Sequence, residues 1–371
     1  MKKLSFLLAL VLLVTVAGCR KQEDLPEVEQ PPVEETEDPV LPQGPLQLET
    51  LRLEITRYDG DTELVLRAAR ELPDLLQRYF AEAETPVEIG KVRVTVGSSA
   101  AATAQSLAQG GVDLAFLPAE TFALCGGAQV LLGNAPQPAI RPDGDSTNAA
   151  DWNGEKTYVP GHTMWAGGTA SLICAAPTEY GRQLAKRAGN GTALTWKELD
   201  HARWGVLEAD SDGGYRCADL YLADNYEGNR ISDLTQVRVY DSYEELLRAA
   251  AEGAVDVIVL RMDARMDAAE AWTLEFGRTD KSGMTGFGRT EPVWQEVACI
   301  AVTETLYTTV AAATPELANE EFLSALTEVL ERLYDEEPEL MGVLGSAHFV
   351  PVEDDDLDAL RRTLTIEGET A

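Results

Sequence analysis

Two stretches decide the fold: "SLAQGGVDLAFL" (residues 106–117) and "SYEELLRAAAEGAVDVIVL" (residues 242–260). Each begins as a helix-like segment, reaches a glycine and continues through Val-Asp into an apolar run. A glycine that ends a helix and a short apolar run after it are typical of a helix that leads into a buried strand of a parallel sheet. Because the pattern occurs once in each half of the chain, we interpret it as a structural repeat and expect two lobes of similar build.

The segments around both stretches alternate between strand and helix patterns. Strands are expected at "LRLEIT" (51–56), "KVRVTVG" (91–97), "RWGVLEAD" (203–210) and "VRVY" (237–240), and helices at "SSAAATAQSLAQG" (98–110) and "GGYRCADLYLADNY" (213–226). "TWKELD" (195–200) offers a capping box from Thr195 to Glu198. This alternation predicts parallel sheets with crossover helices, and 371 residues suffice for two such bodies.

The chain is expected to pass twice between the lobes. "SLICAA" (171–176) begins the second lobe, and "WQEVACIAV" (294–302) leads back from it. We therefore expect lobe I to comprise residues 48–170 and 298–371, and lobe II residues 171–297. Two α/β lobes joined by two crossing strands form a hinge, and a hinge between lobes is a usual place for a ligand cleft.

The N-terminus has the features of an exported lipoprotein. Residues 1–19 comprise "MKK", the apolar run "LSFLLALVLLVTVAG" and Cys19. The run is too short to span a bilayer, and "VAGC" is similar to the bacterial lipobox, so we expect the mature chain to be attached to the membrane through lipid on Cys19. Residues 20–47 are rich in Glu, Asp and Pro, which favours an extended, disordered tether.

Charge and cysteine usage exclude several classes of function. A formal net charge of −33 argues against binding to nucleic acid or to anionic lipid. No C-x-x-C pair or histidine cluster indicates a metal site, and we expect no cofactor. Cys174 and Cys299 lie in strand-like runs that could be neighbours. We nevertheless expect four buried free thiols, at Cys125, Cys174, Cys217 and Cys299.

Two helix starts are expected at the carboxyl ends of strands, where ligands collect in open α/β sheets. At "VTVGSSAA" the cap is Ser98 or Ser99, and at "EADSDGGY" it is Ser211 or Asp212, with Gly213 giving close backbone access. A role as helix caps alone explains the serines equally well. Arg57 and Arg261 follow strands, and with Arg278 they are candidate partners for Asp212. No Ser, His and acid grouping indicates catalysis.

The order of these elements resembles the phosphonate-binding group of ABC-importer solute receptors, which has a two-lobed type II periplasmic-binding α/β fold. The resemblance implies the same fold here, with each lobe a mostly parallel sheet flanked by helices. The stretches that carry it are "QGGVDLAFLPAETFAL" (109–124), "EADSDGGYRCADLYL" (208–222), "DSYEELLRAAAEGAVDVIVL" (241–260) and "SAHFVPVEDDDLDALRRTL" (346–364). With the opening strand they span most of residues 48 to 364.

By position, the resemblance implies ligand contacts from Ser211, Asp212, Gly213, Tyr215, Tyr243 and Glu296. Ala100 and Phe122 stand where the family has tyrosines, and Asp212 replaces a hydroxyl donor. We therefore expect a small phosphonate-like molecule or a zwitterion, with an amine-bearing molecule or a neutral solute as alternatives. Asp212 and Glu296 would face the cation, and Phe122 would supply an aromatic face.

The function that the resemblance implies is that of an extracytoplasmic, lipid-anchored receptor. It would bind a small molecule by hinge closure and deliver it to an ABC permease, without enzymatic activity. A ligand-sensing lipoprotein that reports to a membrane partner is the alternative, and an exported enzyme ranks last because no nucleophile and base are evident.

Overall fold

The computed structural model describes residues 46–56, 62–85, 87–142, 144–158 and 165–370. Residues Pro45–Ala371 form one compact unit. The predicted signal peptide, Cys19, almost all of the predicted tether and Arg57 lie outside the described residues. None of the described helices is long and apolar enough to cross a membrane.

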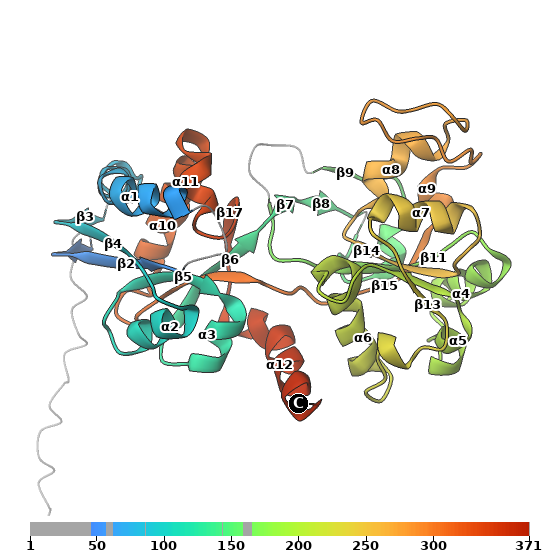
Figure 1. Cartoon of the computed structure of the whole chain (residues 1–371), viewed down its shortest axis with the longest axis horizontal. Coiled ribbons are helices and arrows are strands. Elements are labelled where there is room, and N and C mark those ends of the chain that lie inside the picture. Colours follow the sequence, from blue (N-terminus) through green and yellow to red (C-terminus); the bar gives the residue numbers. More distant parts are fainter. Residues whose placement is uncertain (1–45, 57–61, 86, 143, 159–164, 371) are drawn as a thin grey trace, which may run out of the picture. The chain divides into compact units, whose positions relative to one another are not determined.

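The first sheet has six strands in the order β17-β6-β16-β5-β2-β4 (Figure 1). Its strands are β2 (Leu51–Ile55), β4 (Val92–Val96), β5 (Leu114–Pro118), β6 (Gln129–Ala135), β16 (Thr309–Ala313) and β17 (His348–Pro351). β2 lies parallel to both β4 and β5, whereas β16 is antiparallel to both β5 and β6. The strands β4, β2 and β5 thus form a parallel trio, and β16 lies next to β5 in the opposite direction.

The second sheet has five strands in the order β13-β12-β14-β11-β15. Its strands are β11 (Ser171–Ala175), β12 (Trp204–Val206), β13 (Val237–Val239), β14 (Val257–Arg261) and β15 (Ala298–Val302). β12 is parallel to β13 and β14, and β11 is antiparallel to β14 and β15. Both sheets therefore place a parallel trio next to an antiparallel strand, and this shared order agrees with the repeat inferred from the sequence.

In each sheet, the antiparallel strand next to the parallel trio follows a chain segment that comes from the other lobe. β11 follows the first crossing segment, residues 165–170, and β16 follows the second, residues 303–308. The two segments meet in an antiparallel bridge between Thr169 and Leu306. β15 pairs within the second sheet, so the second crossing begins after Val302 and not at residue 298, where the predicted boundary was placed.

Helices cover both faces of the first sheet (Figure 1). They are α1 (Thr62–Glu82), α10 (Glu320–Glu336) and α11 (Pro338–Gly342) on one face, and α2 (Ala100–Ala108), α3 (Ala119–Cys125) and α12 (Asp358–Thr370) on the other. The rings of Phe80 and Phe322 stack between α1 and α10, with centroids 5.7 Å apart. Strands buried on both faces read as continuous apolar runs, which explains the pattern of "DLAFL".

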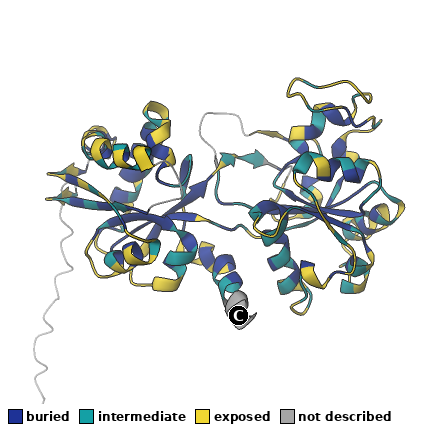
Figure 2. Cartoon of the chain, viewed as in Figure 1, coloured by how far each residue is buried: buried dark blue, intermediate teal, exposed yellow. Residues whose placement is uncertain are grey.

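The second sheet is covered in the same way. Its helices are α7 (Tyr243–Ala251), α8 (Arg265–Trp272), α9 (Val293–Glu296) and η1 (Ala149–Trp152) on one face, and α4 (Glu179–Gly189), α5 (Trp196–His201) and α6 (Cys217–Asn225) on the other. Figure 2 shows that the buried residues concentrate in the strands and on the inner sides of the helices. The expected capping box from Thr195 to Glu198 is present at the start of α5.

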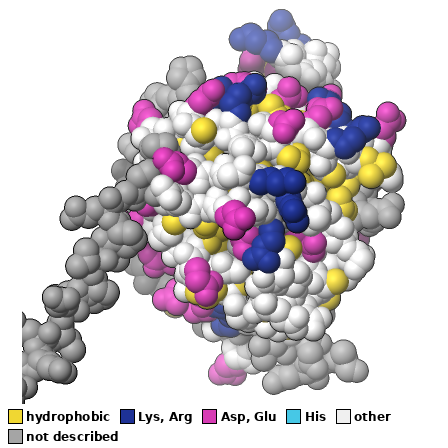
Figure 3. Space-filling model, turned by 90° about the vertical axis from the view of Figure 1, so that its left-hand side faces the viewer, with side chains coloured by type: hydrophobic (Ala, Val, Ile, Leu, Met, Phe, Trp, Pro, Cys, Tyr) yellow, Lys and Arg dark blue, Asp and Glu magenta, His cyan; other side chains and the backbone are white. Residues whose placement is uncertain are grey.

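Short strand pairs and 3-10 turns complete the described chain. The pairs are β1 (Gln47–Leu48) with β3 (Glu88–Ile89), β7 (Gln137–Pro138) with β10 (Trp165–Ala166), and β8 (Ile140–Arg141) with β9 (Thr157–Tyr158). The 3-10 turns besides η1 are η3 (Ile231–Asp233) and η4 (Asp354–Leu357). On the face shown in Figure 3, basic and acidic side chains lie next to one another. Ion pairs among the described residues include Arg67 Nε and Glu71 Oε2 of α1, 2.9 Å apart.

The cysteines depart in part from expectation. Cys174, Cys217 and Cys299 are buried free thiols, but Cys125 is exposed because it lies at the end of the short helix α3. The expected neighbourhood of Cys174 and Cys299 is confirmed, since they are partners in the β11–β15 register.

Candidate functional site

The loop after β12 leads directly into a helix at Ser211. The Ser211 Oγ accepts a hydrogen bond from the Gly214 N–H (3.1 Å) and caps η2 (Asp212–Arg216), a π-helical turn that continues as α6. Of the two predicted caps, Ser211 is therefore the one that acts. Because β12 and β14 are parallel, this helix start lies at the carboxyl edge of the second sheet, as does Arg261, the last residue of β14.

Gly213 allows several elements to converge. A Cβ atom there would lie 2.8 Å from the Cβ of Arg261 and 3.1 Å from the Tyr243 hydroxyl, distances that leave no room for a side chain. The Gly213 carbonyl accepts a hydrogen bond from the Ser171 hydroxyl (2.8 Å), at the start of β11. The "DGG" sequence therefore serves close backbone approach. We call Ser171, Ser211, Gly213, Tyr243 and Arg261 the Gly213 cluster.

Tyr243 and Arg261 give this cluster its donors. The Arg261 guanidinium lies 5.7 Å from the centroid of the Tyr243 ring. Burial raises the pKa of Tyr243, although Ser211 and Arg261 act in the opposite direction, so the phenol stays protonated at neutral pH. Arg261 also pairs with Asp267 and donates to Gln137 Oε1 on β7 (2.8 Å). The cluster can therefore offer hydroxyl and guanidinium hydrogens to an anionic group.

Asp212 takes part in a charge chain that reaches the first sheet. Its Oδ1 lies 3.1 Å from Arg216 Nη1, and Arg216 Nη2 lies 2.8 Å from Glu120 Oε1. Glu120 is in the first turn of α3, the helix that follows β5. The ion-pair partner of Asp212 is thus Arg216, which was not among the arginines named from the sequence. One guanidinium bridges a carboxylate from each lobe.

The two serines of the first sheet lie at its own carboxyl edge. Ser99 caps α2 by accepting a hydrogen bond from the Ala102 N–H (3.2 Å), and Ser98 precedes it. Both side chains are exposed. Nearby, the Glu54 carboxylate accepts hydrogen bonds from Thr103 Oγ1 (2.7 Å) and Thr95 Oγ1 (3.0 Å). This edge therefore adds hydroxyls and a carboxylate.

Three predicted contacts lie in other surroundings. Phe122 is buried (5 % exposed) in an apolar cluster that includes Cys217, so its ring faces the core. Tyr215 lines a separate pocket of about 210 Å³. Glu296 accepts hydrogen bonds from Trp272 Nε1 (2.9 Å) and Arg289 Nε (2.9 Å). Burial alone would raise the pKa of Glu296, but these hydrogen bonds outweigh it and lower the pKa.

Asn134 holds the crossing segments together. Its buried Oδ1 accepts hydrogen bonds from the N–H groups of Thr308 (2.9 Å) and Thr309 (3.3 Å), and its carbonyl accepts one from Gly168 (2.6 Å). Through its side chain and its main-chain carbonyl, this one residue of β6 thus binds both crossing segments. A cavity of about 470 Å³ lies along the second crossing segment. Its lining includes Ala170, Met262, Thr303, Glu304, Tyr307 and Asp355.

In a comparison with known protein families, residues 75–357 match the family described as the phosphonate ABC transporter, periplasmic substrate-binding protein. The chain belongs to this family. It is thus a periplasmic, extracytoplasmic substrate-binding component of an ABC transporter that works with a membrane permease, and not an enzyme. Its fold is the two-lobed type II periplasmic-binding fold that the sequence resemblance implied.

Solved structures that resemble this phosphonate-family protein are distant from it. The binding-protein component of an ABC phosphonate transporter from Pseudomonas aeruginosa is 12 % identical, with 85 % of each chain covered and a TM-score of 0.32. PhnD1 from Prochlorococcus marinus in complex with methylphosphonate is 12 % identical, with 85 % of this chain and 98 % of that chain covered and a TM-score of 0.34. The alkanesulfonate-binding protein SsuA from Xanthomonas axonopodis, bound to MOPS, is 14 % identical, with 86 % and 92 % covered and a TM-score of 0.30. Comparison with curated proteins gives no match.

Sequence reasoning missed two charged residues of this phosphonate-family site, although both carried a signal. Arg216 lies four residues after Asp212, the spacing that brings helical side chains together. Glu120 lies just beyond the carboxyl end of β5, where cleft residues are expected. Asn134 carried no such signal, because its role depends on two chain segments that are distant in sequence. Among the described residues, no group of His, Cys, Asp and Glu side chains is arranged to hold a metal ion.

Proposed function

We propose that this substrate-binding protein binds a small phosphonate-like or zwitterionic molecule between its two lobes by hinge closure. The proposal rests on the Gly213 cluster together with the Asp212–Arg216–Glu120 charge chain. The first offers hydrogen-bond donors, and the second connects the carboxyl edges of both sheets. The division into lobe I and lobe II is part of the proposal.

The anionic end of the ligand is assigned to the Gly213 cluster. The Tyr243 phenol and the Ser211 hydroxyl can donate to phosphonate oxygens, and Arg261 adds charge, although Asp267 offsets part of it. Hydrogen bonds between charged groups and such donors are roughly twice as strong as neutral ones. An anion is therefore accommodated best at the hydroxyls of Ser211 and Tyr243, which the close packing around Gly213 brings together.

The cationic end of a zwitterion is assigned to Asp212 and Glu120. These two carboxylates share the single guanidinium of Arg216, so the charge chain carries one net negative charge. An ammonium group on the ligand would complete the neutralisation. Phe122 and Glu296, which the sequence had suggested for this role, are a buried ring and a carboxylate already held by Arg289.

Closure follows from contacts that the ligand makes with both lobes at once. A ligand shifts an equilibrium between open and closed forms only by its difference in affinity for the two. Because the proposed anionic end contacts the second sheet and the cationic end also contacts Glu120 on α3, a zwitterion would favour the closed form. The membrane permease would then recognise that form.

Attachment to the membrane through lipid on Cys19 is also proposed. It is supported by the lipobox-like "VAGC" sequence and the acidic, proline-rich residues 20–47 that follow. Replacing Cys19 by Ala should release the protein from the membrane fraction of the native host, whereas Cys125→Ala should leave it there. Membrane retention of the Cys19→Ala protein would contradict the anchor.

Ligand chemistry is tested with the purified protein and a defined panel. Methylphosphonate, inorganic phosphate, methanesulfonate, 2-aminoethylphosphonate and ethylamine are compared by native mass spectrometry and thermal shift. We expect the zwitterion or the phosphonate to give the largest rise in Tm, and Tyr243→Phe to weaken that ligand about tenfold by removing one donor to a charged group. Tyr240→Phe is the matched control. Binding of ethylamine alone, or unchanged affinity in Tyr243→Phe, would contradict the assignment.

A further inference from the structure

Two buried thiols lie at matched positions on the first and last strands of the second sheet. Cys174 on β11 and Cys299 on β15 are direct partners in an antiparallel register, with 0 % and 3 % of their surfaces exposed. Both belong to the same apolar cluster, so their side chains are on the same face of the sheet. The register skips one residue on β15 at this point, a bulge that leaves Cys299 facing Cys174.

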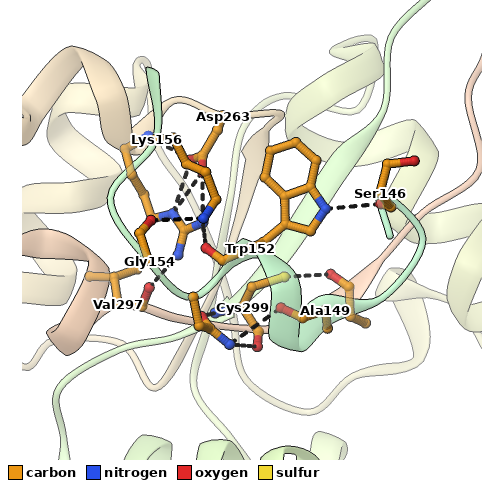
Figure 4. Close-up of polar contacts among 11 residues, drawn as sticks. Ser146, Ala149, Trp152, Gly154, Lys156, Asp263, Val297 and Cys299 are labelled. Atoms are coloured by element: carbon orange, nitrogen blue, oxygen red, sulfur yellow. Dashed lines mark hydrogen bonds and ion pairs between the residues drawn. The ribbon is translucent and has the colours of Figure 1, made fainter. Parts of the chain in front are cut away.

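The backbone around Cys299 shows which kind of cross-strand pair this is. Its N–H donates to Asn153 Oδ1 (2.7 Å), and its carbonyl accepts from Asn153 Nδ2 (3.0 Å). Figure 4 shows Cys299 among the polar contacts near Ala149 and Trp152. Since both backbone groups are directed to Asn153, Cys299 exchanges no ladder hydrogen bond with Cys174. Pairs of this type have Cα atoms about 4.5 Å apart, closer than hydrogen-bonded pairs. Disulfides span Cα separations of about 4.4 to 6.8 Å, so the pair falls within their range.

In this structure both cysteines are free thiols, and the Cys299 thiol donates to the Ala301 carbonyl (3.3 Å). We propose that oxidation joins Cys174 and Cys299 in a disulfide in the mature protein. The family's extracytoplasmic compartment permits such bonds. The oxidant is a disulfide of the thiol–disulfide exchange class. One thiolate attacks it, releasing one oxidant thiol and forming a mixed disulfide; the second thiolate then attacks the mixed disulfide and releases the other oxidant thiol. The protein loses two hydrogens, and the oxidant gains them.

The burial of the pair fixes when this exchange can occur. Burial raises the pKa of Cys299 well above its ordinary value, and the neighbouring Cys174 thiol adds to the effect. The charge of Arg265 opposes this rise and that of Asp263 supports it, so the Cys299 thiol stays protonated in the folded lobe. Exchange requires the thiolate. The bond therefore forms while the chain folds, before η1 and its Asn153 cover β15.

The disulfide would connect the two ends of the second lobe. β11 begins directly after the first crossing segment, and β15 ends directly before the second. A covalent link between them holds both crossing segments at a fixed spacing where they enter the lobe. In the unfolded state, the disulfide would close the chain segment between Cys174 and Cys299 into a loop. The loop lowers the conformational entropy of the unfolded chain and so stabilises the folded lobe.

The test is double alkylation of the full chain, produced in an oxidising compartment and denatured without reductant. Free thiols take a first label, and thiols released by a reductant take a second. We expect Cys174 and Cys299 to carry the second label in about tenfold excess over the first. Cys125 and Cys217 should carry the first. Peptide mapping by mass spectrometry assigns each label.

Two variants keep the result interpretable. In Cys299→Ala, Cys174 should move to the first label, whereas Cys217→Ala should leave the pattern at Cys174 and Cys299 unchanged. Because labelling is done on denatured protein, a folding defect does not obscure the readout. The proposal is overturned if Cys174 and Cys299 carry the first label after the wild-type chain has been refolded with oxidised glutathione. It is also overturned if Cys174 still carries the second label in the Cys299→Ala protein.

Discussion

Replacing Glu120 by Gln removes the carboxylate that ties α3 of the first sheet to Arg216 of the second. The pair is 2.8 Å long, with the Glu120 side chain 46 % exposed, and an exposed ion pair of this kind contributes about 0.2 to 1 kcal/mol. If the pair favours the closed form, its loss should shift the equilibrium between closed and open forms by a factor of about 1.4 to 5 toward the open form. The shift should appear as a lower energy-transfer efficiency between one dye on each lobe, without ligand.

The chain supplies a closely matched control for this change. Glu244 pairs with Arg248 at 2.9 Å and is 43 % exposed, but both residues lie on α7 of the second lobe. Glu244→Gln therefore removes an ion pair of similar length and exposure without separating the lobes. Salt should reduce the difference between wild type and Glu120→Gln, because the charges are partly exposed. Equal energy transfer in wild type and Glu120→Gln, or an equal loss in Glu244→Gln, would refute the reasoning.

Three further outcomes follow from single residues. Arg265→Met should lower the free energy of unfolding by about 3 to 5 kcal/mol in a denaturant titration, because it leaves the fully buried Asp263 without its partner; a loss below 1 kcal/mol would contradict this. The lowered pKa of Glu296 means that its contribution to stability is complete above its unfolded pKa and is lost as pH falls through the lower folded pKa. As the pH is lowered from 7 to 3, the melting temperature should therefore fall more steeply for wild type than for Glu296→Gln; equal slopes would contradict this. Gly213→Ala should lower stability by about 1 to 3 kcal/mol through overpacking, whereas Gly189→Ala, which has open space, should not destabilise; equal effects would contradict the close-approach argument.

The fold could be predicted because its signals are local. The strands of the two parallel trios are short, and each either alternates apolar with polar residues, as β2 and β4 do, or is a continuous apolar run, as in β5. A helix follows each of these strands, and three of the helical segments begin at the serine caps Ser99, Ser211 and Ser242. The repeat of the Gly-Val-Asp junction then placed the same arrangement in both halves. The end of the second lobe was harder to place, because β15 pairs with β11 across more than a hundred residues of sequence.

The charges of the site could be predicted only in part. The helix start at Ser211 and Gly213 followed from the sequence, because caps and glycines act within a few residues. The ion-pair partner of Asp212 could not be predicted in this way. Arg216 lies four residues away, but the sequence does not show which other arginines the fold brings close to Asp212. Phe122 shows the same limit: it belongs to an apolar cluster that also includes Cys217 and Leu220 of α6, and no local pattern encodes that neighbourhood.

The bridge through Arg216 places a condition on the ligand. This guanidinium pairs with both Asp212 and Glu120, so an anion that approached it would have to compete with two carboxylates. A purely anionic ligand therefore gains most from the donors of the Gly213 cluster on the second sheet and little from the first sheet. A zwitterion gains from both, because its cation compensates the net negative charge of the chain Asp212–Arg216–Glu120. If the ligand contacts both lobes as proposed, we expect the charge chain to favour ligands that carry a positive group, because only contacts to both lobes change the balance between open and closed forms.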